Sequence, residues 1–397
     1  MQNFLYSFVK KYNSKKNYKE DISCGIMDLK YDDNSLKILE FGEIEFSAFK
    51  GHESLYGPGK IWGNLWQYLA QLKKPIWYVS SRSSSRSNDK AIDVLYKLNG
   101  LRKKSFEELE KDNNFKLSNQ KSQKSQNVQN SKEGKNSKDG QNSKDGQKSQ
   151  ASKTQKTKLQ DYAGIVVIKN RSNRKAITEK LSEFIVLNDK FTKYCENKHN
   201  AAQLFDSKEL EIFKPAWQSY PFKYHENLAD QISKDLKCET FVIKPVNATR
   251  GEGVIIVEKK DLDKTLKKIL GAIKHSIIRD LNSEYAYWSR YRENIFLVES
   301  FEKSKSILVN KKKYDATMRI VFVMSNNTKV IDFKIIGAYW KLPIKSVSES
   351  GSLNDRHKSK ITKSSVGSAC VSPDDINNVG KIMEKIIPKI YKKILEL

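Results

Sequence analysis

The chain has 397 residues, of which 38% are hydrophobic and 10% aromatic, and its formal net charge is +26. The apolar content is enough for a sizeable core, and the charge would attract nucleic acid, anionic membranes or acidic substrates, although much of it is diffuse lysine. Four widely spaced cysteines without a CxxC pair argue against a zinc ribbon or a secreted disulfide scaffold.

The first residues lack the long apolar region and the small-residue cleavage site of a signal peptide. No stretch approaches the roughly 18 apolar residues that cross a bilayer. We therefore expect a cytoplasmic protein without a membrane partner.

Residues 23–51, SCGIMDLKYDDNSLKILEFGEIEFSAFKG, predict a hairpin. One strand ends at Asp28, a turn lies around Asp33 and Asn34, and the return strand carries Glu40. The interval of 12 residues between Asp28 and Glu40 suits a hairpin with both carboxylates on one side. The alternative is an acidic hairpin whose charges are simply solvated.

A small, mostly parallel α/β layer is expected next. After a Gly- and aromatic-rich stretch (51–71), whose Trp62 and Trp66 are assigned to the core, strands are predicted at 75–81 and 162–170 and helices at 90–100 and 174–188. Between these flanks lies a Ser-, Lys-, Gln- and Asn-rich insertion, 113–158, which repeats NSKDGQ. Such a composition cannot offset its ordering entropy, so we predict disorder there.

Paired strands dominate the sequence after residue 239. They are expected at 240–246, 253–259, 294–301, 316–324 and 329–343, with a helical region at 261–281 between the second and third. The chain closes with an amphipathic helix over 372–397, for which Ser372 is the predicted N-cap and Pro388 a predicted kink.

The stretch KPVNATRGEGVIIV, residues 244–257, is physically suited to a triphosphate. Lys244 offers a point charge at the end of a strand, and Arg250 offers a forked donor. Gly251 and Gly253 let backbone N–H groups approach phosphate oxygens closely. Taken alone, the stretch also fits an ordinary hairpin with a tight turn.

This stretch and its surroundings resemble the ATP-grasp superfamily of ligases. LNDKFTKYCENKHNAAQLFD (187–206) resembles the family segment with a first phosphate-binding lysine, which implies that role for Lys198, while Lys244, Arg250, Gly251 and Gly253 correspond to the second lysine and flap. LVESF (297–301) is similar to the adenine-reading strand, with Glu299 at the adenine or ribose. YDATMRIVFVM (314–324) and the loop 337–359 imply phosphate- or substrate-directed roles for Arg319, Asn354 and Arg356, and a weaker one for Lys341.

In that family, a metal-binding Asp and Glu follow the last helix, yet here the residues that would supply them stand at the front. The resemblance therefore implies a circular permutation, with Asp28 and Glu40 as Mg²⁺ ligands, which suits the preference of Mg²⁺ for oxygen. The family usually has Asn two residues after the Glu, whereas this chain has Gly42. Glu43 or Ser47 could substitute, as could Asp332.

Together these features predict an α/β (α+β) protein with an ATP-grasp fold. The expected domains are residues 1–51 with the permuted metal hairpin, a small Rossmann-like domain of 52–112 and 159–188, the insertion 113–158, and a nucleotide-binding domain of 189–397. The resemblance implies an ATP- and Mg²⁺-dependent ligase that joins a carboxylate to an amine through an acyl phosphate. The alternative is a degenerate ATP-binding or nucleic-acid-associated protein; nucleic acid is the less favoured partner.

Overall fold

The structure is a computed structural model. It describes residues 12–13, 20–43, 46–72, 74, 76–80, 102–105, 164–168, 184–249, 251–271, 284–327, 330–358 and 367–396. Contacts divide the chain into two compact units, Met1–Tyr68 with Asn188–Leu397 and Leu69–Leu187.

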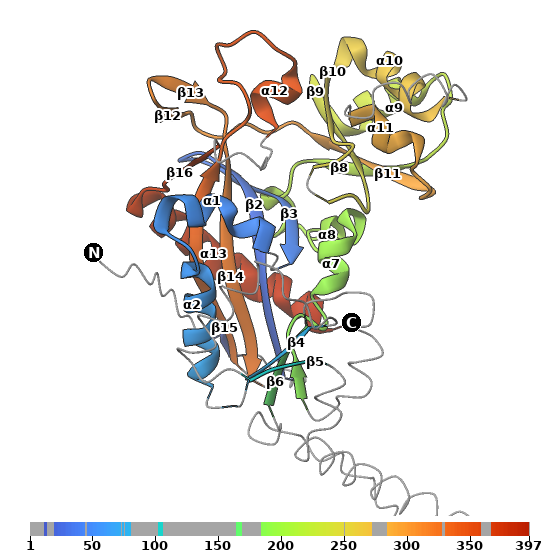
Figure 1. The fold of residues 1–397 in the computed structure, drawn as a ribbon. Coiled ribbons are helices and arrows are strands. Elements are labelled where there is room, and N and C mark those ends of the chain that lie inside the picture. Colours follow the sequence, from blue (N-terminus) through green and yellow to red (C-terminus); the bar gives the residue numbers. More distant parts are fainter. Residues whose placement is uncertain are drawn as a thin grey trace, which may run out of the picture. The chain divides into compact units, whose positions relative to one another are not determined.

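The first unit is built on an antiparallel sheet in the order β1-β15-β14-β2-β3, with β16 paired to β15 (Figure 1). Its strands are β1 (Tyr12–Asn13), β2 (Asp21–Tyr31), β3 (Leu36–Glu43), β14 (Thr317–Asn327), β15 (Val330–Lys341) and β16 (Ser368–Ala369). The predicted hairpin is confirmed as β2–β3, but β2 runs three residues past Asp28 to Tyr31, because Leu29 and Tyr31 continue the apolar face into the core. The N-terminal hairpin thus pairs with a strand from near the C-terminal end of the chain.

Helices cover both faces of this sheet. On one face, α13 (Pro373–Leu395) packs its apolar stripe on the core that contains Ile331, Phe333 and Ile335 of β15. On the other face lie α1 (Phe46–Tyr56) and α2 (Lys60–Ala70), where Tyr339 donates a hydrogen bond to the Ala48 carbonyl at 2.7 Å. Because side chains alternate along a strand, a sheet covered on both sides is apolar on both sides.

The C-terminal helix begins as predicted. The Ser372 hydroxyl accepts a hydrogen bond from the Asp375 amide at 3.1 Å, and Pro373 occupies the first turn, where its missing N–H costs nothing. The helix continues through Pro388 to Leu395.

A second antiparallel sheet in the first unit has the order β10-β9-β11-β8. Its strands are β8 (Trp217–Pro221), β9 (Thr240–Pro245), β10 (Ile255–Glu258) and β11 (Ile295–Ser300), and the helices beside it are α9 (Leu228–Leu236), α10 (Lys259–Leu270) and α11 (Glu284–Ser289). Phe241 and Ile243 of β9 enter the core shared with these helices, so the alternate residues Val242 and Lys244 project from the opposite face. The helix predicted over 261–281 ends at Leu270, and residues 272–281 lie outside the described part.

Shorter elements connect these layers. They are α7 (Thr192–Glu196), α8 (Lys198–Gln203), the 3₁₀ turn η3 (Glu211–Phe213), the hairpin β12 (Ile307–Val309) and β13 (Lys312–Tyr314), and α12 (Leu353–His357). Ser352 and Asp355 form a capping box at the start of α12, which fixes this short helix locally.

The second unit contains a parallel sheet in the order β5-β4-β6-β7. Its strands are β4 (Ile76–Ser80), β5 (Arg102–Ser105), β6 (Gly164–Ile168) and β7 (Phe184–Val186). The parallel layer is therefore confirmed, but the helix predicted over 174–188 is wrong at its end, where the apolar run FIV forms β7. The predicted helix 90–100 and the insertion 113–158 lie outside the described residues.

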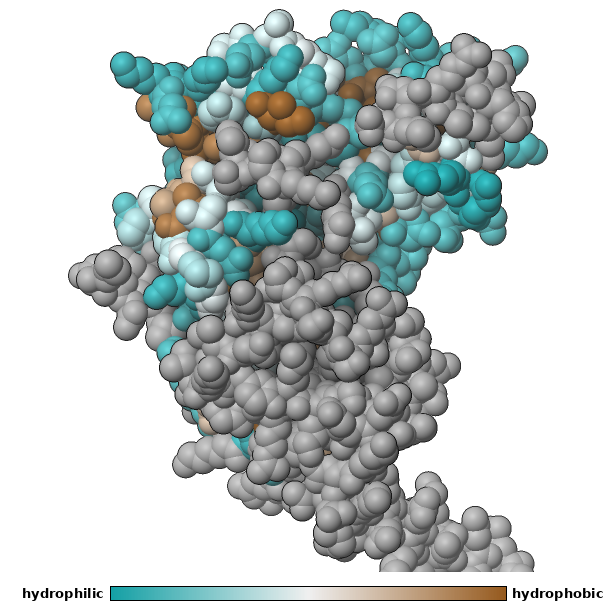
Figure 2. Space-filling model, in the orientation of Figure 1, coloured by the Kyte–Doolittle hydropathy of each residue, from teal (hydrophilic) through white to brown (hydrophobic). Residues whose placement is uncertain are grey.

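Residues 52–68 belong to the first unit, whereas the sequence assigned them to the small domain. They belong there because α1 and α2 bury Phe49, Trp62 and Trp66. In addition, the Asn64 side chain donates a hydrogen bond to the Ile336 carbonyl of β15 at 2.8 Å. The coloured surface in Figure 2 is mainly hydrophilic with small, separate apolar spots, as expected for a Lys-rich chain. No described helix combines the length and the apolar character needed to cross a bilayer.

Candidate functional site

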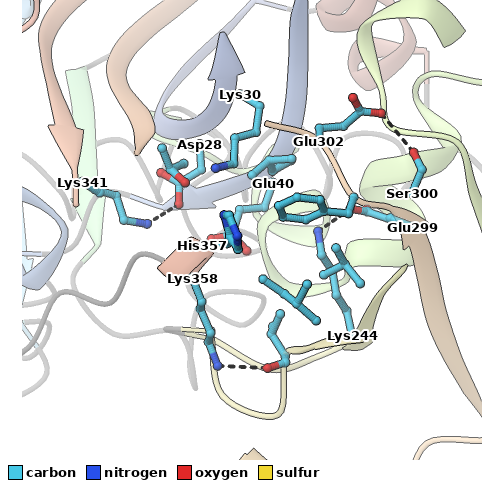
Figure 3. A pocket seen from close by; sticks show the side chains of 17 residues that line it. Asp28, Lys30, Glu40, Lys244, Glu299, Ser300, Glu302, Lys341, His357 and Lys358 are labelled. Atoms are coloured by element: carbon cyan, nitrogen blue, oxygen red, sulfur yellow. Dashed lines mark hydrogen bonds and ion pairs between the residues drawn. The ribbon is translucent and has the colours of Figure 1, made fainter. Parts of the chain in front are cut away.

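A pocket in the first unit lies between residues of the two antiparallel sheets (Figure 3). Its empty volume is about 670 Å³, open solvent included. The charged residues that line it come from six elements or the loops beside them, namely Asp28, Lys30, Glu40, Lys244, Glu299, Glu302, Lys341, His357 and Lys358. Gly251, between β9 and β10, completes this wall.

Asp28 and Glu40 are paired across β2 and β3, at a register irregularity that follows Asp28. Asp28 accepts two hydrogen bonds from Arg319, Nε to Oδ1 at 2.6 Å and Nη2 to Oδ2 at 2.8 Å, and one from Lys341 at 2.6 Å. Burial alone would raise the pKa of Asp28, but the charges and hydrogen bonds of these two cations hold it far below its usual range. The charge of Glu40 acts on Arg319 and Lys341 as well.

Glu299 lies between two lysines. Lys214 contacts one carboxylate oxygen at 2.5 Å and Lys244 contacts the other, and all three side chains are buried. Burial lowers the pKa of Lys214 to about 8, against the opposing charge of Glu299. Burial would raise the pKa of Glu299, but the two lysine charges outweigh it and lower the pKa.

Lys198 is the first residue of α8. Its ammonium donates to the Ala248 carbonyl, and its backbone N–H donates to the Val246 carbonyl at 2.7 Å, so the helix start is tied to the strand that carries Lys244. Burial lowers the pKa of Lys198, and the charges of Glu40 and Lys244 both act on it. The residues proposed as first and second phosphate lysines are therefore electrostatic neighbours.

The β9–β10 hairpin forms as the sequence predicts, with Ile255 opposite Ile243. Gly251 and Gly253 have φ values of +70° and +68°, in the left-handed region where glycine is strongly favoured. Arg250 lies outside the described residues.

The loop that follows β15 differs from the prediction. Asn354 and Arg356 do not line the pocket; the next two residues, His357 and Lys358, do. The Asn354 side chain accepts a hydrogen bond from the Ile256 amide at 2.9 Å, and Lys358 donates to the Val254 carbonyl at 3.1 Å. Asn354 thus holds α12 against the outer edge of β10.

His357 is part of a buried chain of charges that sequence reasoning missed. Its Nδ1 lies 2.8 Å from Asp315, whose other oxygen accepts from Lys30 at 2.9 Å. The side chain of His357 is only 10% exposed, because α12 folds over the pocket. Lys30 follows Asp28 by two residues, so strand alternation could have placed it on the same face.

The predicted metal ligands separate into three places. Asp28 and Glu40 line the pocket, whereas Glu43 lies three residues further along β3 and accepts a hydrogen bond from Thr192. Asp332 is also elsewhere, within 3.4 Å of the Tyr68 hydroxyl. Among the described residues, no three His, Cys, Asp or Glu side chains gather as a metal-binding group.

No protein-family model and no curated protein matches this sequence. Among solved structures, the chain is similar to a provisionally named gamma-glutamylcysteine synthetase from Methylobacillus flagellatus KT, with 12% identity, a TM-score of 0.42, and 96% of this chain and 90% of that chain covered. It is also similar to the D-alanine-D-alanine ligase from Coxiella burnetii, with 10% identity, a TM-score of 0.25, and coverage of 59% and 68%. Both TM-scores lie below 0.5, so neither similarity establishes a shared fold.

Proposed function

We propose that this protein is an ATP- and Mg²⁺-dependent ligase that joins a carboxylate to an amine through an acyl phosphate. One observation carries the proposal: an acidic pair from the N-terminal hairpin, Asp28 and Glu40, lines the same pocket as Lys244, Gly251 and Glu299 from the middle of the chain. Carboxylates for a metal and cations for phosphate thus occur together, as phosphoryl transfer requires.

The triphosphate would lie against Lys244 and Lys198, with the hairpin around Gly251 above it. Lysine provides a point charge for phosphate, and a glycine backbone allows close approach of N–H groups. Glu299 would release Lys244 when phosphate arrives, because a more highly charged anion competes for the same ammonium. The flap would exclude water, which otherwise hydrolyses an acyl phosphate.

The donor set fits Mg²⁺. This ion is usually held by one or two carboxylates together with water and substrate phosphates, so Asp28 and Glu40 suffice without a third acidic residue. When bound, Mg²⁺ would neutralise charge on the phosphates. Of the two, Glu40 is the more available ligand, because Asp28 already pairs with Arg319 and Lys341.

The remaining cations suit the acyl group. Arg319 and Lys341 both pair with Asp28, and Lys341 lines the pocket, so these two cations could hold the substrate carboxylate while it attacks the γ-phosphate and then stabilise the charge of the acyl phosphate. An amine would then displace phosphate to give an amide. Asn354 would support this reaction from a distance by holding α12 on the flap.

A permuted order of elements is part of the proposal. What supports it is the contact between the last turns of α13 and the start of β2, where the Tyr391 hydroxyl donates to the Asp21 carboxylate. A strand placed after such a helix would enter the sheet beside β14, where β2 lies.

The test follows ADP formation from MgATP with a panel of amino acids and acidic peptides, with hydroxylamine present to trap acyl phosphates as hydroxamates. We expect a hydroxamate with at least one carboxylate, and its loss in Lys244→Met but not in Lys234→Met, whose lysine is exposed. If the protein binds MgATP but releases ADP only at the background rate with every carboxylate, the proposed ligase activity is refuted.

A second candidate is a nucleotide-binding protein without ligase activity. It is favoured by Gly42, which stands where the related ligases usually carry a metal-binding Asn, and by the cations that already saturate Asp28. MgATP binding without hydroxamate formation supports it. RNA binding that survives removal of residues 113–160 and weakens steeply with salt would indicate a nucleic-acid role.

A further inference from the structure

Three polar side chains from distant segments, a lysine, an aspartate and a histidine, form a buried chain that ends in the pocket. Lys30 on β2 contacts Asp315 Oδ1 at 2.9 Å, and Asp315 Oδ2 contacts His357 Nδ1 at 2.8 Å. Lys30 also donates to the carbonyls of Asp315 and Ala316, and the Ser304 amide donates to Asp315 Oδ1 at 2.8 Å. The Asp315 carboxylate is therefore held at Oδ1 by two donors, Lys30 and the Ser304 amide, which leaves Oδ2 for the imidazole.

This arrangement determines which ring nitrogen of His357 carries a proton. Burial would raise the pKa of Asp315, but the hydrogen bond to His357 and the charge of Lys30 lower it, so the carboxylate is ionised. An ionised carboxylate accepts hydrogen bonds and donates none, so Nδ1 must carry the proton. In the neutral ring the lone pair then lies on Nε2.

The ring stands in the pocket rather than behind it. It lines the wall together with Asp28, Glu40 and Lys244 (Figure 3). The ring of Phe301 packs against it in a T-shaped arrangement, with ring centroids 5.0 Å apart. A buried, oriented imidazole with one free nitrogen is the arrangement of a general base.

Four other ionisable groups of the wall are less suited to take a proton. Asp28 and Glu299 are each held by two cations, which lower their pKa. Lys358 donates to Val254 and pairs with Glu284 at 2.8 Å, so it is a cation and not an acceptor. Glu40 is assigned to the metal.

We propose that His357 is the base that receives the proton of the attacking amine, and that Asp315 is its positioning residue. This inference rests on the proposed ligase function. As the nitrogen forms its bond to the acyl carbon, the carbon–oxygen bond to phosphate breaks and its electron pair leaves with phosphate. The proton of the nitrogen passes to Nε2, and Asp315 stabilises the resulting imidazolium until it loses the proton to solvent.

The test separates the two halves of the reaction. Asn at position 357 can keep a donor near Nδ1 but has no counterpart of Nε2, so His357→Asn should keep α12 in place and remove the base. We expect hydroxamate formation from MgATP, carboxylate and hydroxylamine to stay within about threefold of wild type, because hydroxylamine attacks as a neutral molecule. Ligation to amino-acid amines should fall by about 10²–10⁴-fold, the usual contribution of general base catalysis.

His225→Asn is the matched control, since His225 is exposed and does not line the pocket; both reactions should be unchanged. Amine ligation by His357→Asn at the wild-type rate, with hydroxamate formed, overturns the inference and leaves the ligase intact. Absence of hydroxamate with wild type refutes the ligase instead.

A readout without turnover completes the test. In ¹⁵N NMR spectra at pH 8.5, the signals of His357 are those of wild type that disappear in His357→Asn. These signals should show a neutral ring protonated at Nδ1. In Asp315→Asn, the same ring should shift toward the tautomer protonated at Nε2. A neutral wild-type ring protonated at Nε2, with its lone pair turned away from the pocket, would overturn the assignment whatever the substrate.

Discussion

Asp28 and Arg319 face each other across neighbouring strands, β2 and β14, and form a two-point ion pair with distances of 2.6 and 2.8 Å. One partner comes from residue 28 and the other from residue 319, so the pair joins the N-terminal hairpin to the C-terminal half of the sheet. Both side chains are buried, and Lys341 adds a second cation to the same carboxylate. The pair therefore bears on stability as well as on the proposed reaction.

Asp28→Asn keeps the shape of the side chain and removes its charge. Two buried cations would then face a neutral amide, which costs about 3–5 kcal/mol for a broken buried pair. Urea unfolding without Mg²⁺ measures the loss of unfolding free energy. The control is Asp33→Asn in the turn of the same hairpin, whose side chain is 74% exposed and pairs with Lys305 at 3.3 Å; its cost should not exceed about 1 kcal/mol. Equal effects of the two changes would mean that Asp28 is not a buried charge centre.

Lys214 predicts a dependence of stability on pH. Burial lowers its pKa to about 8 in the folded chain, from 10.5 as the ordinary value. Between these values the unfolded chain binds a proton that the folded chain does not, so raising the pH favours the folded state. Relative to Lys214→Met, wild type should therefore gain on the order of 1–2 kcal/mol between pH 8 and 9.5, at 1.36 kcal/mol per pKa unit. Urea unfolding at both pH values checks this, with Lys234→Met as control; a difference that does not grow with pH contradicts it.

The two glycines of the flap should respond differently to alanine. Both have positive φ, which costs about 1–2 kcal/mol for a residue with Cβ. At Gly253 the new Cβ would also lie 2.6 Å from Pro245 Cγ and 2.9 Å from Tyr287 Cδ1, whereas at Gly251 it meets only the flexible end of Lys358 at 3.1 Å. Thermal unfolding should show Gly253→Ala as clearly the more destabilising change. The reverse order would mean that the hairpin is arranged differently.

The hydrogen bond between Asn354 and β10 should slow amide hydrogen exchange at the edge of the flap. Asn354 Oδ1 accepts the hydrogen bond of the Ile256 amide on β10, which stands at the edge of its sheet. Asn354→Ala should raise the exchange rate of that amide by roughly tenfold, as expected for loss of a bond worth about 1 kcal/mol. Hydrogen exchange followed by NMR measures it, and Asn377→Ala on the exposed face of α13 is the control. Unchanged exchange at Ile256 would show that α12 does not hold the flap.

Local patterns predicted much of the first unit. The alternation around Asp28 and Glu40 gave the hairpin and its facing carboxylates, and the apolar runs on either side of Gly251 gave the flap. Ser372 gave the start of the last helix. These features depend on residues close together in sequence, whose geometry is fixed by backbone periodicity and capping.

Features that depend on contacts between distant segments could not be predicted from local patterns. Phe184–Val186 has the spacing of a helix end but forms a strand, because a parallel partner, β6, is available beside it. The segment after β15 has five consecutive polar residues, 354–358, and only the direction of α12 selects His357 for the pocket over Arg356. Glu43 has the same side chain as Glu40, but it lies beside Thr192.

The sequence by itself determined which chemistry the chain carries: a lysine followed by a glycine-rich hairpin, and a pair of carboxylates twelve residues apart. Only the tertiary structure decided which of the many charges meet. It placed β2 beside β14, set Lys214 against Glu299, and brought Lys30, Asp315 and His357 into one buried chain. The reason is physical: local periodicity sets the face on which a side chain lies, whereas buried ion pairs form between strands and loops that only the packed core brings together.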